Sequence, residues 1–302
     1  MACLWSSPLQ LTPVTIALAT GRAFATTDAD LPLIVAAAAA RGLDAEIAVW
    51  DDDSVDWSVY DVVVVRSCWD YLDRRDDFLA WAGRVPKLLN PVDVLTWNTD
   101  KVYLRELANA GVPVIDTRWD IRRGDDLPRS GPQGGTAVDE WVVKPSISGG
   151  GRDTARWGDP DDVYAHSEEL NAAGRTAMVQ PYVASVDSEG ETALMYFGGR
   201  FSHAIRKGPL LECGEGVRQD RDQREVITPR APTAAQLDVA EQVLAAIPSS
   251  MGTAESLAYA RIDLVTDHDG APRLIELELA EPSLFLDHAE EGAERLVDVL
   301  SR

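Results

Sequence analysis

The chain has 302 residues, and its 28 lysines and arginines against 50 aspartates and glutamates give a formal net charge of −22. So acidic a surface repels phosphodiester backbones and anionic lipids, which argues against nucleic acid and membranes as partners. A hydrophobic content of 45% with 26% charged residues is ordinary for a globular protein, and the length allows a core divided over two or three lobes. Disorder and repeats are therefore poor interpretations.

The cysteines favour a reduced, cytoplasmic protein. Cys3, Cys68 and Cys213 are far apart and form no CxxC pair. The longest apolar stretch, residues 31–40, is too short for a membrane span and too far from the N-terminus for a signal sequence. Residues 1–13 carry no basic side chain and predict a flexible extension before the first strand.

The N-terminal part of the chain predicts a parallel α/β domain. Residues 14–20 and 45–50 are expected to be strands flanking an alanine-rich helix at 30–41, and strand, helix and strand in this order form a right-handed parallel unit. Four consecutive valines within 61–71 predict another strand, buried on both faces. The polar residues after it leave the carboxyl end of that strand, where open α/β sheets bind ligands.

Two α+β lobes are expected to follow. Residues 96–108 predict a capped helix, and the polar segment 120–140, with Gly131-Pro132 and Gly134-Gly135, predicts a mobile insertion. Further on, we expect strands at 141–144, 176–180, 193–206, 259–266 and 273–279, and helices at 159–173 and 233–246. Because these strands and helices do not alternate regularly, we predict a substrate-binding domain at 1–92 and two lobes at 93–180 and 181–302.

A glycine loop follows the strand at 141–144. In Val-Val-Lys144-Pro-Ser-Ile-Ser-Gly-Gly-Gly151 a lysine at the strand end precedes three glycines, whose amides could converge on phosphate oxygens. The order differs from a Walker A motif. Taken alone, the segment is equally compatible with a flexible hairpin.

Carboxylates near the C-terminus form a more specific pattern. Strand alternation places Glu276 and Glu278 on one face and buries Ile275, Leu277 and Leu279 on the other. If the neighbouring strand brings Asp263 alongside, three oxygen ligands surround a point suited to magnesium. Solvated edge carboxylates are the alternative, but the apolar flanks of both strands argue against it.

Arg261 precedes Asp263 by two residues and therefore shares its face. A guanidinium there could stabilise charge developing during phosphoryl transfer, or could simply neutralise the acidic cluster. The two roles are compatible.

The order of these motifs resembles the ATP-grasp superfamily over nearly the whole chain. That resemblance implies an ATP clamped between two lobes and a carboxylate activated as an acylphosphate, with no protein nucleophile. It implies nucleotide contacts from Lys101, Lys144, Ser146, Ser148, Gly149, Gly150, Gly151, Gln180, Tyr182, Val183 and Glu191. It also implies Mg²⁺ ligands at Asp263, Glu276 and Glu278, with Arg261 as a catalytic residue beside them.

One position departs from the pattern. The glutathione synthetase branch of the superfamily has an arginine two residues after its ribose-binding acid, where this chain has Ala193. Arg206 or Lys207 could supply the missing charge, and we expect Arg206 in that catalytic role. A surface strand is the alternative.

The most similar branch contains the enzyme that closes O-ureido-serine to D-cycloserine. The shared patterns are Arg66-Ser-Cys-Trp-Asp-Tyr71, Trp97-Asn-Thr-Asp-Lys101, Phe197-Gly-Gly-Arg-Phe-Ser-His203 and Glu278-Leu-Ala-Glu-Pro-Ser-Leu284. We expect an amino-acid-like substrate, which needs both an anion partner and an ammonium partner. The candidate contacts are Arg66, Ser67, Trp69, Asp70, Tyr71, His203, Glu281 and Ser283.

The resemblance thus implies an ADP-forming carboxylate–amine ligase that closes a ring within one substrate. An intermolecular amino-acid or dipeptide ligase and a noncatalytic ATP-binding sensor remain as alternatives. A ligase extending an acidic peptide would need a basic groove, which a charge of −22 does not favour. A homodimer is compatible with the sequence, which does not fix the oligomeric state.

Overall fold

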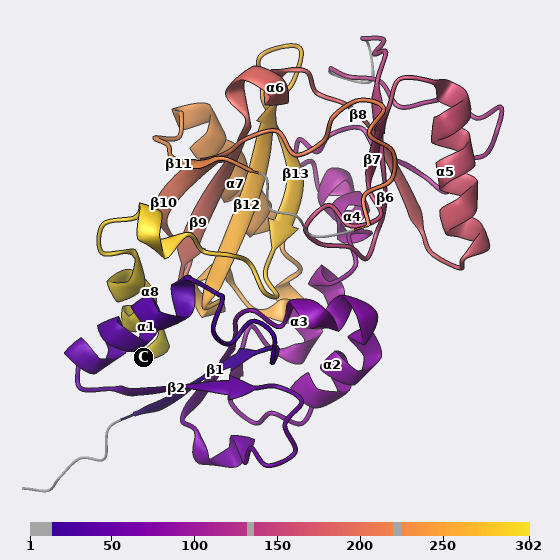
Figure 1. Ribbon diagram of the computed structural model, residues 1–302. Helices are drawn as coiled ribbons and strands as arrows, with labels where there is room; N and C mark the ends of the chain where they lie inside the picture. Colours follow the sequence, from indigo (N-terminus) through magenta and orange to yellow (C-terminus); the bar gives the residue numbers. More distant parts are fainter. Residues whose placement is uncertain (1–13, 132–135, 220–224) are drawn as a thin grey trace, which may run out of the picture.

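The computed structural model describes residues 14–131, 136–219 and 225–302. The expected N-terminal extension, Cys3, Pro132, Gly134 and Gly135 lie outside these ranges. The described residues form three sheets, with the first at the bottom of Figure 1 and the other two above it. Among the helices of these ranges, none is long and apolar enough to cross a membrane.

The first sheet is parallel throughout, as expected for the N-terminal part of the chain. Its strand order is β2-β1-β3-β4, so α1 provides the crossover between β1 and β2. The elements are β1 (Thr15–Thr20), α1 (Asp30–Ala40), β2 (Asp44–Val49), β3 (Val62–Val65), α2 (Arg75–Ala82) and β4 (Leu88–Leu89). The valines of β3 are largely buried because α1 covers one face of the sheet and α2 the other.

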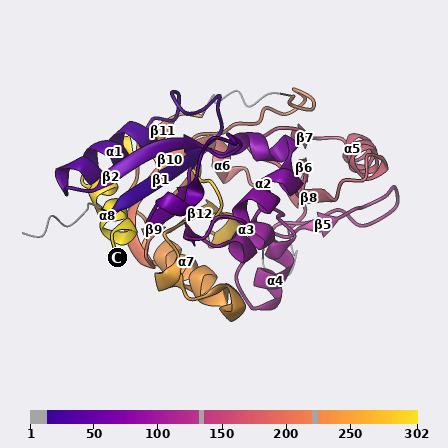
Figure 2. The same cartoon turned by 90° about the horizontal axis from the view of Figure 1, so that it is seen from below.

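The central sheet is antiparallel, with strand order β11-β10-β9-β12-β13. Its elements are β9 (Glu191–Phe197), β10 (Arg200–Lys207), β11 (Ile227–Pro229), α7 (Ala234–Ala246), β12 (Tyr259–Thr266), β13 (Pro272–Glu278) and α8 (Gly292–Leu300). Leu194 and Tyr196 of β9 pack toward α7, whereas Met195 and Phe197 pack toward α8 and α1. Figures 1 and 2 show α1 and α8 side by side against the sheet.

The third sheet lies at the right of Figure 1, with strand order β5-β8-β6-β7. Its elements are β5 (Arg118–Trp119), β6 (Trp141–Pro145), β7 (Ala155–Trp157), α5 (Pro160–Ala172) and β8 (Ala177–Pro181). Val163 and Leu170 of α5 pack on Val143 and Val179, so this helix covers one face of the sheet. The short helix α6 (Ser185–Glu189) then leads into the central sheet.

The prediction of a single helix at 96–108 is wrong, because two helices occupy this region. α3 (Val92–Asn98) ends where the Thr99 hydroxyl donates to the Leu95 carbonyl, at 2.8 Å. The Asp100 side chain then accepts from the Val102 amide before α4 (Tyr103–Asn109) begins. Small polar side chains that bond the local backbone compete with helix continuation. The break leaves Lys101 between the two helices.

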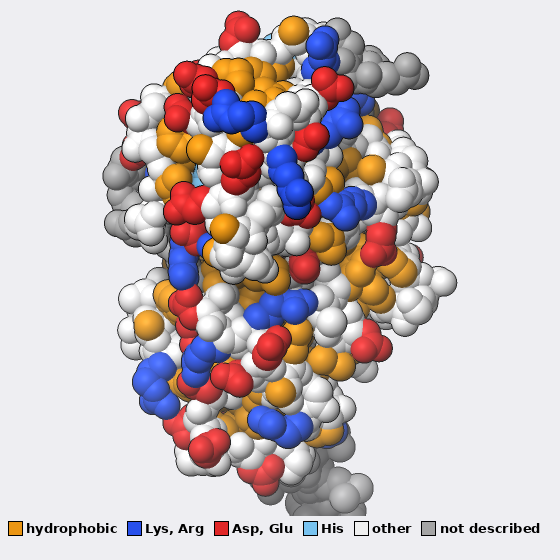
Figure 3. Space-filling model, turned by 90° about the vertical axis from the view of Figure 1, so that its right-hand side faces the viewer, with side chains coloured by type: hydrophobic (Ala, Val, Ile, Leu, Met, Phe, Trp, Pro, Cys, Tyr) orange, Lys and Arg blue, Asp and Glu red, His pale blue; other side chains and the backbone are white. Residues whose placement is uncertain are grey.

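Surface charge is mixed on the face drawn in Figure 3, where acidic and basic side chains are interspersed. Arg123 with Asp161 and Lys87 with Asp61 are examples of exposed ion pairs. Exposed pairs of this kind add little stability.

Candidate active site

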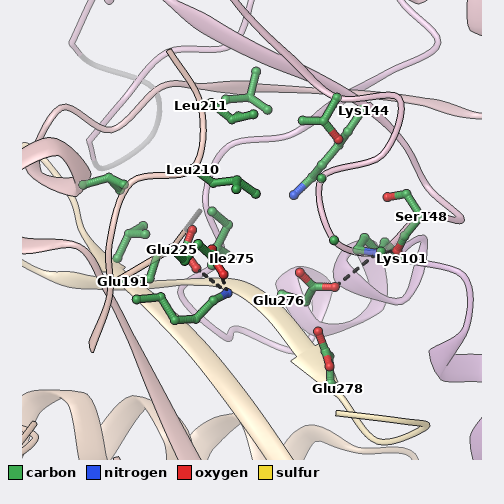
Figure 4. Close-up of a pocket in the computed structure, with 18 of the residues that line it drawn as sticks. Lys101, Lys144, Ser148, Glu191, Leu210, Leu211, Glu225, Ile275, Glu276 and Glu278 are labelled. Atoms are coloured by element: carbon green, nitrogen blue, oxygen red, sulfur yellow. Dashed lines mark hydrogen bonds and ion pairs between the residues drawn. The ribbon is translucent and has the colours of Figure 1, made fainter. Parts of the chain in front are cut away.

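A cavity lies between the central sheet and the third sheet, and most of the expected site residues line it (Figure 4). These are Trp69, Lys101, Lys144, Ser148, Gly149, Gly150, Gly151, Gln180, Tyr182, Val183, Glu191, Arg261, Glu276, Glu278, Glu281 and Ser283. Asp263 is fully buried behind the cavity wall, where it binds Arg261 and Lys207, two residues that line the cavity. The other expected residues do not line the cavity, namely Arg66, Ser67, Asp70, Tyr71, Ser146, His203 and Arg206.

Strand register brings the three carboxylates together. Asp263 on β12 pairs with Glu276 on β13, and Arg261 pairs with Glu278. Directly paired residues lie on the same face of a sheet. One oxygen of each carboxylate can be chosen so that all three lie within 4.8 Å of one another. The arrangement matches the oxygen cluster expected from the sequence.

Buried charge determines the protonation of this cluster. Burial raises the pKa of Asp263, but the guanidinium of Arg261 and the ammonium of Lys207 outweigh it and lower that pKa overall. Arg261 binds Asp263 at 2.9 Å and Glu278 at 2.5 Å. Burial together with the neighbouring carboxylates nevertheless raises the pKa of Glu278 to about 8, with Arg261 opposing the shift. The cluster therefore lacks enough positive charge to ionise all its acids at neutral pH.

A β-bulge overturns the expectation that Ile275 faces the core. Asp263 pairs with Glu276, whereas the next residue, Leu264, pairs with Leu274, so Ile275 is the extra residue on β13. Ile275 is turned into the cavity, while Leu277 and Leu279 are buried as expected. In Figure 4, Ile275 lies close to Glu276 on the cavity side of the strand.

Two lysines extend into the cavity from different elements. Lys101, between α3 and α4, binds Glu276 at 3.1 Å and the Ser148 carbonyl at 2.5 Å. Burial lowers the pKa of Lys144 on β6, although Glu276 partly offsets it. Among the described residues, the Lys144 ammonium makes no ion pair within 4 Å, and Figure 4 shows it directed into the open space. It is thus available to an anionic ligand.

Lys207, not Arg206, supplies the charge opposite Ala193. Ala193 lies on β9 between Ile205 and Asp263, and its small side chain leaves room for the neighbouring cation. The Lys207 ammonium lies 2.9 Å from Glu191 and 3.2 Å from Asp263. The Arg206 guanidinium instead donates to the carbonyls of Ser188 and Glu189, outside the cavity.

Glu225 also lines the cavity, 3.9 Å from Lys207, and the sequence analysis did not identify it. Burial raises the pKa of this acid, with Lys207 opposing the shift. Glu225 lies just before β11. It reaches the cavity because β11 pairs with β10, the strand that carries Lys207. No local motif marks that position.

The glycine loop curves over the lysines. Gly150 and Gly151 have φ values of 60° and 73°, a backbone region that favours glycine. The Ser146 carbonyl accepts from the Lys101 amide, so Ser146 supports the loop from outside the cavity. The Ser148 hydroxyl donates to the Pro145 carbonyl at 3.0 Å. The loop can therefore present main-chain amides to an anion.

Many of the cavity's lining residues are apolar. Tyr182 stacks against the Arg156 guanidinium, 3.5 Å from its ring centre, and its hydroxyl donates to Asp187. Gln180 donates to the Thr117 hydroxyl, and the Tyr182 amide donates to the Glu140 carbonyl. The remaining lining there is aliphatic, from Ile115, Val142, Val183, Val186, Leu210, Leu211 and Val265. Apolar lining of this kind suits an aromatic ring.

One end of the cavity carries polar groups from the loop at residues 280–286. Glu281 and Ser283 line it together with Trp69, whose indole N–H donates to the Glu281 carbonyl. The Tyr71 hydroxyl binds the Glu281 carboxylate, and burial raises the pKa of Glu281 to about 7 despite this bond. Trp69 and Tyr71 lie in a 3₁₀ turn that follows β3.

Four of the expected substrate contacts bind other parts of the protein and do not line the cavity. Arg66 is 1% exposed and donates to the Pro282 carbonyl. Ser67 hydrogen-bonds Thr20, and Asp70 binds Trp50 and Arg74. His203 likewise binds the Leu284 carbonyl at 2.8 Å rather than lining the cavity.

Comparison with known proteins places the chain in a family. Residues 16–90 match the family described as D-cycloserine synthetase DcsG, N-terminal domain. The crystal structure of D-cycloserine synthetase DcsG superposes with a TM-score of 0.82 at 35% identity, covering 95% of this chain and 98% of that one. ATP-grasp ligase PsnB complexed with minimal precursor, Mg and ADP superposes with a TM-score of 0.62 at 16% identity, covering 98% of each chain, which shows the shared fold.

The three-sheet fold and the lysine–carboxylate cavity define an ATP-grasp ligase, an enzyme that joins a carboxylate to an amine at the expense of ATP. Over 300 residues the chain is 37% identical to the cycloserine biosynthesis protein DcsG of Streptomyces lavendulae, covering 95% of this chain and 97% of that protein. The chain belongs to the DcsG family, as the resemblance noted from the sequence predicted.

Proposed function

We propose that this enzyme closes O-ureido-D-serine to D-cycloserine with conversion of ATP to ADP and phosphate. The observation that carries the proposal is the cavity itself, which combines apolar side chains, cations and three carboxylates with polar groups beside Glu281. The 37% sequence identity to DcsG, which extends over 95% of this chain and 97% of that protein, supports the choice of substrate.

In this proposal the nucleotide lies along the cavity. Adenine lies among the apolar side chains beside Tyr182 and Val183, and Glu191 binds the ribose hydroxyls. Lys101, Lys144 and the amides of residues 149–151 hold the phosphates, because ammonium groups directed into a cavity (Figure 4) and a glycine loop both favour anions. The noncatalytic sensor lacks support, because the lysines and the carboxylates are all present.

The acidic cluster fits a magnesium ion. Three carboxylate oxygens within 4.8 Å suit a hard cation such as Mg²⁺. Asp263, Glu276 and Glu278 would hold it. When bound, Mg²⁺ neutralises phosphate charge and favours phosphoryl transfer.

The chain's own residues position the reaction. The substrate carboxylate attacks the γ-phosphorus, ADP leaves, and Arg261 stabilises charge on the transferred group. The ureido nitrogen bonded to oxygen then attacks the acyl carbon, which forms the ring C–N bond and releases phosphate with the carboxylate oxygen. Loss of the carbamoyl group takes up one water and yields carbon dioxide and ammonia. Glu281 and Ser283 bind the substrate's polar groups at this end.

Asp263→Asn and Glu276→Gln test the assignment. Each removes a charged oxygen ligand from the cluster, so we expect ADP release in the presence of Mg²⁺ and O-ureido-D-serine to fall at least about a hundredfold. Glu241→Gln, on the exposed side of α7, is the matched control and should retain activity. Full activity in either cluster variant, in a folded protein, would contradict the metal assignment.

A further inference from the structure

The loop at residues 280–286 is held almost entirely by side chains from other parts of the chain. Its carbonyls accept from Trp69, Arg66, Arg261 and His203, and Tyr259 donates to the Ala280 carbonyl. Its amides at Leu284 and Leu286 donate to one carboxylate, Asp30, at 2.7 and 2.8 Å. Asp30 is the first residue of α1 and is 4% exposed, and no motif in the sequence marked it as a site residue.

Phe285 lies between the two amides that Asp30 binds. Its backbone is left-handed, with φ 51° and ψ 45°, a conformation that a bulky residue adopts only when its surroundings enforce it. Its side chain lines the cavity beside Glu281 and Ser283, with the ring centre 5.9 Å from the Arg261 guanidinium carbon. The two hydrogen bonds to Asp30 hold this turn from both sides.

We propose that Asp30 is a positioning residue for the ligase reaction. By binding the Leu284 and Leu286 amides it holds Phe285 in the left-handed turn, so that the phenyl ring forms the apolar wall of the substrate end beside Arg261. Phe285 is then a specificity-determining residue, which favours a small amino-acid substrate over one that carries a further residue. This inference rests on the proposed function only in placing the substrate at this end of the cavity.

The supporting geometry extends to Arg66. Its guanidinium lies 3.5 Å from Asp30 and donates to the Pro282 carbonyl, so one ion pair of the first domain binds both sides of the loop. Burial raises the pKa of Asp30, while Arg66 and the two amides oppose the shift. An asparagine at position 30 would keep the size but turn an N–H₂ group toward one of the two amides.

The test is steady-state kinetics with Asp30→Asn and Phe285→Ala. Loss of one hydrogen bond to a charged acceptor should raise the KM for the amino-acid substrate about tenfold in Asp30→Asn, with the KM for ATP changed by less than about twofold. Phe285→Ala should raise the same KM. Phe201→Ala, which removes a ring that is 39% exposed on β10, is the control and should change neither constant.

The double variant separates positioning from a merely structural role. If Asp30 acts through Phe285, the fold-increase in substrate KM in the double variant should be smaller than the product of the fold-increases in the two single variants. Multiplicative effects, equal rises in both KM values, or no rise would overturn the proposal. If Asp30→Asn does not fold, an unchanged substrate KM in Phe285→Ala still overturns it.

A readout independent of activity is hydrogen exchange at the Leu284 and Leu286 amides. Exchange should be at least about tenfold faster in Asp30→Asn than in the parent protein, since one bond to a charged acceptor is lost. Equal protection would overturn the proposal. If the parent enzyme releases ADP with another carboxylate and not with O-ureido-D-serine, the proposed substrate fails, and the KM comparison is made with that carboxylate.

Discussion

Lys207 and Arg206 are neighbours in the sequence but lie on opposite faces of β10. Strand alternation predicts that one of them points away from the cavity, but it does not say which. The register of β10 on β9 decides, because it pairs Lys207 with Glu191 and so brings the ammonium to Asp263. The sequence predicted a cation at this position, but the expectation that Arg206 supplies it was wrong.

Lys207→Met should lower kcat/KM for ATP by about a hundredfold or more, because it leaves the buried Asp263 and the half-buried Glu191 carboxylates without their shared cation. Arg206→Ala, one residue away and bound to carbonyls outside the cavity, is the control and should stay near the parent value. Steady-state ADP release measures both. A large loss in Arg206→Ala with an active Lys207→Met would reverse the assignment.

Other site residues follow from contacts that no local pattern encodes. Ile275 enters the cavity because a bulge interrupts the alternation that would bury it, and Glu225 reaches it through pairing of β11 with β10. Leu210 and Leu211 cover the cavity from a loop without regular structure (Figure 4). Asp263, Glu276 and Glu278, in contrast, are charged residues in apolar strands, and Lys144 lies at a strand end before three glycines, so local signals identified them; Lys101 was identified only through the family resemblance.

At the level of elements, the sequence predicted most strands and several helices but missed others, and length did not separate the two groups. β1, β3, α5, α7, β12 and β13 all lie within a residue or two of their expected positions. α8 was missed, although Ala293, Leu296, Val297 and Leu300 have helical spacing and are all buried. The polar residues between α3 and α4 ended a helix that periodicity alone would continue.

His203 connects β10 to the loop at residues 280–286. Since the Leu284 carbonyl can only accept, the Nε2 atom carries the hydrogen, and Nδ1 then accepts from the Ser202 hydroxyl. Burial lowers the pKa of His203 to about 4, helped by Arg295 and His288 and opposed by the Leu284 carbonyl. The imidazole is therefore neutral and fixed in one tautomer.

This shift predicts a loss of stability in acid. Below pH 6.5 the unfolded state binds a proton on this histidine that the folded state does not bind until about pH 4, so the free energy of unfolding should fall by about 3 kcal/mol across that range. His203→Gln keeps a donor to the Leu284 carbonyl and removes the titration. Denaturant unfolding of both proteins at several pH values should show curves that diverge in acid, and parallel curves would contradict the assignment.

Across the whole molecule, the first domain and the central sheet share a core. Ile16, Leu18 and Val64 of the first sheet pack in one cluster with Met195 and Phe197 of β9. The sequence predicts separate sheets, but it does not show that the apolar side chains of the first sheet and of β9 pack into one common core. The shared core predicts one cooperative unfolding transition for these two parts. Two separate calorimetric transitions would contradict it.

Asn90, which precedes α3, links the N-terminal part of the chain to the central sheet by hydrogen bonds. It is fully buried, has a left-handed backbone with φ 54°, and makes hydrogen bonds to Ala258, Tyr259 and Leu279. Asn90→Ala should lower the free energy of unfolding by about 3 kcal/mol, because three buried groups lose their partner. Asn90→Gly, which tolerates the backbone conformation, should lose slightly less. If the free energy of unfolding of the alanine variant changes by less than about 1 kcal/mol, the packing of the N-terminal part on the central sheet does not depend on these hydrogen bonds.

The most direct test of the central claim is to incubate the enzyme with ATP, Mg²⁺ and O-ureido-D-serine and to identify the products by mass while measuring ADP. The L-isomer and a panel of free amino acids are run in parallel. We predict ADP release that depends on O-ureido-D-serine, with D-cycloserine formed in equal amount. Formation of a dipeptide or another amide would instead show intermolecular ligation, and nucleotide binding without turnover on any substrate would contradict the claim that this cavity catalyses ring closure.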